Sequence, residues 1–336
     1  MPGSGALARA SVRVPDLRVL ADGIALPGVI SADVKSNGYA AADRFCVRFA
    51  AAAGGLVAVD VAGLRLDVQV GLGGGWTSLI VGEADRVGFD VVEGVVEVDG
   101  RDLSALMLDS RVDETFANRT SGEIVQVIAA RHGLVVDIAA AGGVAGRYYQ
   151  SDHERVALGQ FGRSMTEWDL VAGLAQREGF SVSMVGETLR FGPIEDSGAA
   201  VLTPADCESL HMEHVMPMQR SIEVTVRSWA QQDGTAVSRT ARGGGSGRAW
   251  THHVTRPNLP AEEAQTLAER ILADLVRQER RVEVRMPGEL GISVRGRVLL
   301  QGTGTAWDRA YAVSEVNRRI DVRGGFMQTL VMLGVV

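Results

Sequence analysis

Two histidines and a carboxylate crowd together at only one place in the sequence, where His211 and His214 flank Glu213. On a helix the two histidines would share a face and could bind zinc, whereas on a strand they would point to opposite faces. The stretch runs toward a β pattern and lacks HExxH spacing, so we expect no metal there. The adjacent pair His252 and His253 suits one metal poorly and is predicted to lie in a solvated loop.

Other polar stretches also fall short of a catalytic pattern. The run at 152–154 (Asp-His-Glu) could do acid–base chemistry, but adjacent polar residues in a loop usually stay solvated. Ser246 is not in a nucleophile elbow, because Arg248 stands where GxSxG needs glycine. The stretch GLGGGW at 71–76 ends in Trp76 where GxGxxG needs its third glycine. We therefore predict no catalytic residue, no cofactor and no metal, although a glycosidase-type carboxylate pair stays open.

Composition places the chain among folded globular proteins. It has 336 residues, 46% of them hydrophobic and 22% charged, and a net charge of −7. Acidic and basic residues are interspersed, which argues against tight binding to a phosphate backbone. No signal-peptide pattern or long apolar run occurs, so we expect synthesis in the cytoplasm and no membrane span. Cys46 and Cys207 are far apart and are predicted to be small core residues.

The first third of the chain has the two-residue periodicity of half-buried antiparallel strands. Apolar and polar residues alternate in 45–49, 66–70 and 96–99, and the glycine-rich stretch at 71–76 reads as a hairpin tip. We predict a first β domain over residues 1–110. It ends at the stretch that begins with Gly100, where strand periodicity changes to helix periodicity.

A small αβ insert is predicted over residues 111–198. Thr120 to Glu123 has the spacing of a capping box, an apolar helical stripe follows, and Gly133 ends the helix before a strand at 134–138. The same order returns with a cap at 164–167, a stop at Gly179 and a strand at 180–184. We expect the two helix–Gly–strand units to pack on each other.

Residues 199–336 are predicted to form a second β domain with one long helix at about 260–279. Alternation at 222–227 indicates a strand, 241–250 is glycine-rich and predicts an exposed loop, and the chain closes in strands. The glycine-rich tips near residues 73 and 245 are either flexible or ordered against a neighbouring subunit. The predicted class is α+β, mainly β, with two β-barrel domains around the insert. The tryptophans predicted to anchor the cores are Trp168, Trp229 and Trp307.

Three stretches together resemble a known family. VGEADRVGFDVVEGVVEVDGRDLSALMLD at 81–109, TVRSW at 225–229 and VRGRVLLQGTGTAWDRAYAVSEVNRRID at 294–321 are similar to the phage late control protein D family. This family comprises baseplate hub proteins of contractile-tailed phages and is related to the amino-terminal part of type VI secretion spike proteins. The matching motif residues are Gly100, Arg101, Asp102, Trp229, Gly302, Gly304 and Tyr311.

The resemblance implies a structural virion component of the tail baseplate and not an enzyme. It implies tube-like β domains and a homotrimeric ring that joins a sixfold tail tube to a threefold central spike. The partners would be the tail tube protein, the spike protein and the baseplate wedge proteins, with tape measure protein and DNA passing through the lumen during ejection. An acidic lumen would limit DNA adsorption. The alternatives are a cell-wall-degrading hub enzyme, or the hub of a tailocin, a gene transfer agent or a non-contractile phage.

Overall fold

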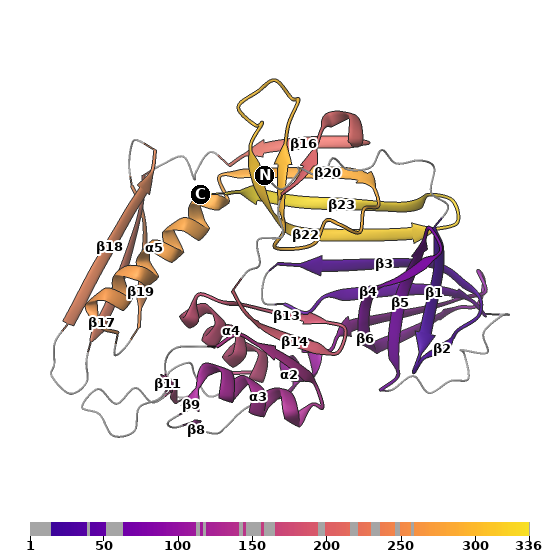
Figure 1. Cartoon of the computed structure of the whole chain (residues 1–336), viewed down its shortest axis with the longest axis horizontal. Coiled ribbons are helices and arrows are strands. Elements are labelled where there is room, and N and C mark those ends of the chain that lie inside the picture. The colour runs from indigo at the N-terminus through magenta and orange to yellow at the C-terminus, as the bar shows by residue number, and fades with distance from the viewer. Residues whose placement is uncertain are drawn as a thin grey trace.

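A computed structural model gives the arrangement of the chain (Figure 1). It describes residues 15–38, 41–51, 63–111, 115–116, 119–140, 144–145, 156–157, 165–193, 199–215, 221–229, 236–245, 249–256 and 259–335. Strands dominate, and the helices are short apart from one. The fold is thus mainly β with an added αβ part, as the sequence predicts.

The amino-terminal strands form one curled antiparallel unit. Their bounds are β1 (Asp16–Ala21), β2 (Ile24–Ala25), β3 (Val29–Asn37), β4 (Arg44–Ala50), β5 (Arg65–Leu72), β6 (Gly75–Asp90) and β7 (Val95–Asp102). They pair in the order β3-β4-β7-β6-β5-β1-β2, and β1 also lies against β3. The inner face of this curl is apolar because every second residue points inward, as Phe45, Val47 and Phe49 do.

The carboxy-terminal strands extend the same sheet. Their bounds are β15 (Ala199–Leu202), β16 (Ser209–His214), β20 (Arg280–Pro287), β21 (Arg297–Leu300), β22 (Ala310–Asp321) and β23 (Gly325–Gly334). β22 pairs with β3, so eight strands follow one another as β16-β20-β23-β22-β3-β4-β7-β6. Figure 1 shows them stacked from β16 at the top to β6 below. A second apolar core around Tyr311 and Leu330 underlies this half.

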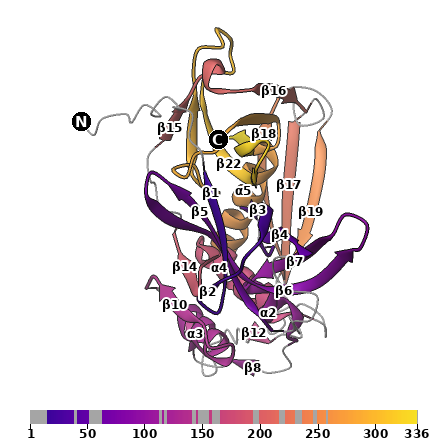
Figure 2. The ribbon, with the colours of Figure 1, turned by 90° about the vertical axis from the view of Figure 1, so that its right-hand side faces the viewer.

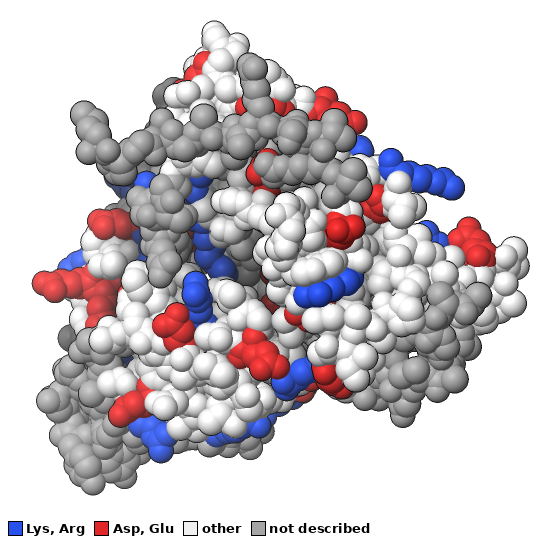
Figure 3. All heavy atoms as spheres, turned by 45° about the vertical axis from the view of Figure 1, so that its right-hand side comes forward, with Lys and Arg blue, Asp and Glu red and all other residues white. Residues whose placement is uncertain are grey.

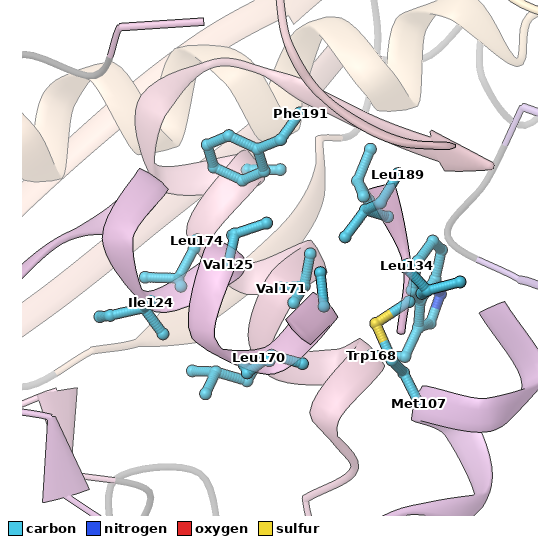
Figure 4. Close-up of a cluster of buried hydrophobic side chains, with 14 of the residues drawn as sticks. Met107, Ile124, Val125, Leu134, Trp168, Leu170, Val171, Leu174, Leu189 and Phe191 are labelled. Carbon is cyan, nitrogen blue, oxygen red and sulfur yellow. The ribbon is translucent and has the colours of Figure 1, made fainter. Parts of the chain in front are cut away.

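The insert is built on a single core shared by three helices. α2 (Ser104–Asp109), α3 (Ser121–Arg131) and α4 (Glu167–Glu178) lie beside a small sheet in the order β10-β14-β13. The strand bounds are β10 (Val135–Ile138), β13 (Ser181–Val185) and β14 (Thr188–Gly192). Figure 4 shows side chains of α3 and α4 turned toward one another and toward β14. The two predicted helix–Gly–strand units therefore do pack together. Four two-residue strands complete this part: β8 (Thr115–Phe116), β9 (Arg119–Thr120), β11 (Val144–Ala145) and β12 (Val156–Ala157).

The helix caps explain where α3 and α4 begin. Thr120 and Glu123 form the predicted capping box. The second cap is Thr166 with Asp169, not the predicted cap at 164–167. The prediction was wrong by two residues because Glu167, expected to close the box, instead turns inward. Gly179 ends α4 with φ +73°, as predicted.

A separate three-stranded sheet packs on the long helix. β17 (Ser221–Trp229) lies between β18 (Ala236–Gly244) and β19 (Trp250–Thr255), and α5 (Ala261–Arg277) covers one face through Ala264 and Ala268. Two predictions were wrong here, because residues 241–244 and the pair at 252–253 are in strands. In the predicted loop at 241–250, Gly245 and Ala249 lie outside a strand, and 246–248 lie beyond the described residues.

Within the described part of the chain, no helix has the length and apolarity to cross a membrane.

Candidate functional site

The glycine of the Gly100–Asp102 motif allows a close approach of two strands. A Cβ on Gly100 would lie 2.2 Å from the carbonyl oxygen of Glu83 on β6 and 2.3 Å from the Phe45 ring. On β6, a Cβ on Gly82 would lie 2.0 Å from the carbonyl oxygen of Arg101. The register between β6 and β7 shifts beside this contact, at Ala84. Only glycine fits at both positions, so the motif fixes how the two strands cross.

The next two motif residues join the strand to α2. The Asp102 carboxylate is buried and accepts hydrogen bonds from the backbone N–H and the hydroxyl of Ser104. Burial raises the pKa of Asp102 to about 6, and the nearby carboxylate of Asp43 adds to that rise. Arg101 forms paired hydrogen bonds with Asp85, both at 2.7 Å, and also bonds Asp109 at 2.8 Å. The motif is therefore the end of β7, from which Arg101 and Asp102 hold the α2 segment that leads into the insert.

Buried charged side chains lie where the two halves of the sheet and the insert meet. Burial raises the pKa of the Asp43 carboxyl and lowers the pKa of the Arg295 and Arg318 guanidinium groups. The attraction between Asp43 and each arginine partly offsets these shifts. Arg318, on β22, donates to the Ile292 carbonyl at 2.5 Å. Arg295 donates at 2.7 Å to the carbonyl of Val182 on β13. These contacts tie the carboxy-terminal strands to the insert.

The carboxy-terminal family motif forms a tight turn. Gly302 and Gly304 have φ of +84° and +67°, a region that favours glycine. Between them Thr303 donates its hydroxyl to Asp308 at 2.5 Å and its backbone N–H at 3.0 Å. The hydroxyl bond is the main reason why the pKa of the Asp308 carboxyl lies below its usual value, and the backbone bond lowers it as well. Tyr311 is fully buried and its hydroxyl donates to the Trp307 carbonyl at 3.0 Å. These residues shape the turn and its core rather than a reactive centre.

Among the residues that the structure describes, the histidines do not come together as metal ligands. His211 and His214 lie on β16 with alternating exposure, so they face opposite sides, as predicted for a strand. His214 pairs with Glu279 at 2.8 Å. His253 is exposed on β19. The acidic stretch at 152–154 lies outside the described residues.

A cluster that the sequence did not suggest surrounds Cys46. Its sulfur and carboxylate oxygens of Glu97 and Asp99 lie within 4.8 Å of one another. Burial, together with the carboxylates of Asp99 and Glu97, raises the pKa of the Cys46 thiol to about 12, so the thiol stays protonated and is a poor metal ligand. Asp99 is in addition bonded to Arg86 at 2.9 Å. The prediction that Cys46 is a core residue was wrong, because it lies half-buried on the outward side of β4.

The tryptophans differ in burial from one another. Trp168 is 2% exposed in the insert core, as predicted, and Trp307 packs partly buried on the core below β22. Trp229 is 46% exposed at the end of β17, so its predicted role as a core anchor was wrong. It lies on the face of β17 opposite Ile222, Val224 and Val226, which pack against α5.

The outward face of the eight-stranded sheet carries rows of paired charges. Register aligns Arg86, Asp99, Cys46, Asp33 and Arg319 across five strands. Basic and acidic residues occur on this face in similar numbers: Lys35, Arg44, Arg48, Arg86, Arg101, Arg281, Arg285 and Arg319, with Asp33, Glu83, Asp90, Glu97, Asp99, Glu213, Glu283, Glu315 and Asp321. Ion pairs link several of them, among them Lys35–Glu315 at 3.0 Å and Arg86–Asp99, in which a terminal guanidinium nitrogen (Nη2) lies 2.5 Å from the carboxylate. The acidic excess of the chain is thus not concentrated here, and Figure 3 likewise shows small, interspersed patches of both charges.

No family model matches the sequence, and no curated protein matches it. Solved phage tail structures do match the fold. A tail protein from Neisseria meningitidis MC58 gives a TM-score of 0.76 at 15% identity, over 96% of this chain and 97% of that one. The 43 kDa tail protein of prophage MuSo2 from Shewanella oneidensis gives 0.74 at 16% identity, over 95% and 98%. The E. coli c3393 protein, a type VI secretion component structurally similar to the T4 tail proteins gp27 and gp5, gives 0.55 at 13%, over 95% and 77%. The chain therefore has the fold of these tail proteins, which is consistent with its resemblance to the late control protein D family.

Proposed function

We propose that the chain is a structural hub protein of a phage tail, of the contractile type that the family resemblance implies. Three copies form a ring that joins the sixfold tail tube to the threefold central spike, and DNA passes through its centre. The likeness in fold to tail proteins over nearly the whole chain supports this proposal. We retain the domain limits near residues 110 and 198 as part of it.

The observation that carries the proposal is the pairing of β22 with β3. It joins two β units of one chain edge to edge, through seven aligned residue pairs from Glu315–Asn37 to Asp321–Ser31. One chain then contributes two side-by-side sectors to a ring, and three chains contribute six. Such a ring has threefold symmetry in its chains and approximate sixfold symmetry in its sheet sectors.

We further propose that the outward face of the eight-stranded sheet lines the channel. Its charges are balanced and paired, so this wall would be nearly neutral and not acidic as we expected from the sequence. Arginines that are already paired with carboxylates are less available to bind the phosphates of DNA. Arg319, for example, bonds Asp321 at 3.0 Å. A wall of this kind would let DNA pass with little adsorption.

A cell-wall-degrading hub is the alternative function. It needs two carboxyl groups with separated pKa values beside a bound sugar chain. Among the described carboxyl groups, those whose pKa is raised by burial include Asp43 and Asp102. Their oxygens, however, accept hydrogen bonds inside the fold, from Asn37 and Ser104. We therefore favour the structural role.

A reconstruction of the assembled particle tests the proposal directly. We expect three copies of the chain around the tail axis, between tube and spike, with the outward sheet face toward the channel. One or six copies, or a position away from the axis, would contradict it. Clearing of peptidoglycan by the purified chain, abolished by one Asp or Glu change, would favour the enzyme instead.

A further inference from the structure

The insert is packed as a unit of its own. Among the described residues, every buried or partly buried apolar side chain of its core comes from residues 103–191, and the strands of the large sheet contribute none. The two halves of that sheet have separate cores, around Phe49 and around Leu330. Figure 2 shows α3 at the lower end of the molecule, opposite the end that carries β16. Two units that do not share a large apolar interface are expected to move relative to each other.

Polar contacts hold this unit against the rest of the chain. Arg295 donates at 2.7 Å to the carbonyl oxygen of Val182, on β13, which is an edge strand of the small sheet. Near the tip of the β13–β14 hairpin, Glu187 pairs with Arg65 at 2.9 Å. The side chains of this second pair are well exposed, and an exposed ion pair contributes little to stability. The bond from Arg295 to Val182 is therefore the stronger of the two contacts.

The backbone of Arg295 has a conformation that arginine rarely adopts. Its φ is +66°, in the left-handed region that favours glycine. Two hydrogen bonds at 2.9 Å fix this loop to β22, from the Arg295 N–H to the Val313 carbonyl and from the Val313 N–H to the Gly296 carbonyl. Arg318 supports the same loop by its bond to the Ile292 carbonyl. The backbone of Arg295 thus belongs to the carboxy-terminal strands, and only its side chain extends to the insert.

The connection from the large sheet into the insert is short. β7 ends at Asp102 and α2 begins at Ser104, so Leu103 alone lies between them. Asp102 is paired with Gly82 on β6, whereas Leu103 belongs to the insert core. A change in the backbone angles at Leu103 would turn the insert without breaking either core, as hinges of one or a few residues at element ends do. The bonds between Asp102 and Ser104 lie at this pivot, where atoms move least.

We propose that the insert turns as a rigid unit about Leu103, and that Arg295 is the latch that holds it against the carboxy-terminal strands. Opening breaks the hydrogen bond to Val182 and the ion pair between Arg65 and Glu187, and it leaves the apolar cores intact. The closed form is the major state and the open form a minor one. The inference concerns the single chain and does not rest on the proposed function.

Distances between two spin labels, measured by double electron–electron resonance, test the hinge in the full chain. In a background of Cys46→Ala and Cys207→Ala, Ile24→Cys labels β2, where the side chain is 73% exposed, and Gln126→Cys labels an exposed position of α3. Arg295→Gly should raise the population of a second distance about tenfold, the effect of losing one hydrogen bond from a charged donor. Glu187→Gln alone, an exposed change that leaves the fold intact, should act in the same direction by a smaller factor.

Two further variants serve as controls. Arg323→Ala removes an exposed arginine in the turn after β22 and should leave the distance unchanged. Arg295→Ala lacks the latch but keeps the unfavourable φ, so it should open the insert as Arg295→Gly does. It should also unfold at a lower urea concentration than Arg295→Gly, because alanine fits this backbone less well than glycine.

A label pair within the insert distinguishes turning from unfolding. Gln126→Cys and Gln176→Cys occupy exposed positions of α3 and α4, and the distance between them should not change in the Arg295→Gly background. The amides of both helices should likewise keep their protection from hydrogen exchange. A broadened distance within the insert, or loss of this protection, would mean that the insert unfolds and would contradict the hinge.

The result that overturns the inference is a single, unchanged distance between positions 24 and 126 in both Arg295→Gly and Arg295→Gly/Glu187→Gln. The contact from Arg295 would then only stabilise the fold. That result would leave the hub proposal standing. Conversely, a particle that contains one or six copies of the chain would contradict the hub and leave the hinge unaffected.

Discussion

Replacing Gly100 with alanine should destabilise the sheet where β6 crosses β7. The added methyl would lie 2.2 Å from the Glu83 carbonyl oxygen and 2.3 Å from the Phe45 ring, and no real Cβ contact is that short. Phe45 is 2% exposed and cannot swing into solvent, so the strands must separate or the core must repack. Overpacking of this kind costs about 1–3 kcal/mol, and we expect about 3 because a backbone atom is involved.

The matched control is Gly88→Ala on β6. Its Cβ would have one neighbour, the Glu97 carbonyl oxygen, at 4.0 Å. Alanine in an extended, open position lowers the entropy of the unfolded chain, so we expect about 0.5 kcal/mol of stabilisation. Urea unfolding followed by circular dichroism gives the free energies, and hydrogen exchange of β6 and β7 amides locates the change. Equal stability of the Gly100→Ala and Gly88→Ala proteins would refute the close-approach argument.

Two further changes probe the insert. Asp102→Asn should remove a pH dependence: a carboxyl whose folded pKa is about 6 instead of 3.8 binds its proton more tightly when folded, so its contribution to stability is present at low pH and lost as pH rises through 6. Relative to the variant, the wild type should therefore gain about 2 kcal/mol between pH 7 and pH 4, measured by urea unfolding, and a constant difference would contradict the assignment. Glu167→Gln should cost about 2 kcal/mol, because the buried carboxylate pairs with Arg131 at 2.9 Å and with His132. Loss of hydrogen-exchange protection at the start of α4, without change in β22, would locate that effect.

Local signals made most of the elements predictable. A capping box needs only two residues three positions apart, and a glycine with positive φ is a common helix end. Both signals are local, so α3 was predictable from Thr120 and Gly133. Alternation likewise predicts β4 and β5. The second cap was misplaced because two Thr/Ser–acid spacings overlap there. The choice of Thr166 depends on Glu167 turning toward Arg131, a contact between helices that no local rule contains.

Long-range pairing and the choice of face were not predictable. The pairing of β22 with β3 joins residues about 280 positions apart, and alternation alone does not say which strand lies next to which. For the same reason Trp229 and Cys46 were assigned to cores. Alternation assigns residues to two sides of a strand, but only the assembled sheet decides which side is covered.

The surface that is left for function is the side of each strand that does not pack in an apolar core. Each strand of the eight-stranded row gives one side to an apolar core, so the other side is free to serve a channel or a partner. The same alternation continues to β16 and β6 at the two ends of the row. On β6, Phe89 lies on the core side of the strand but is exposed, because the described part of its own chain provides no apolar core around it. Phe89 therefore marks the place where the alternation of the sheet extends beyond the apolar core of this chain, and a polar residue at this position would lower the tendency of the exposed edge to aggregate.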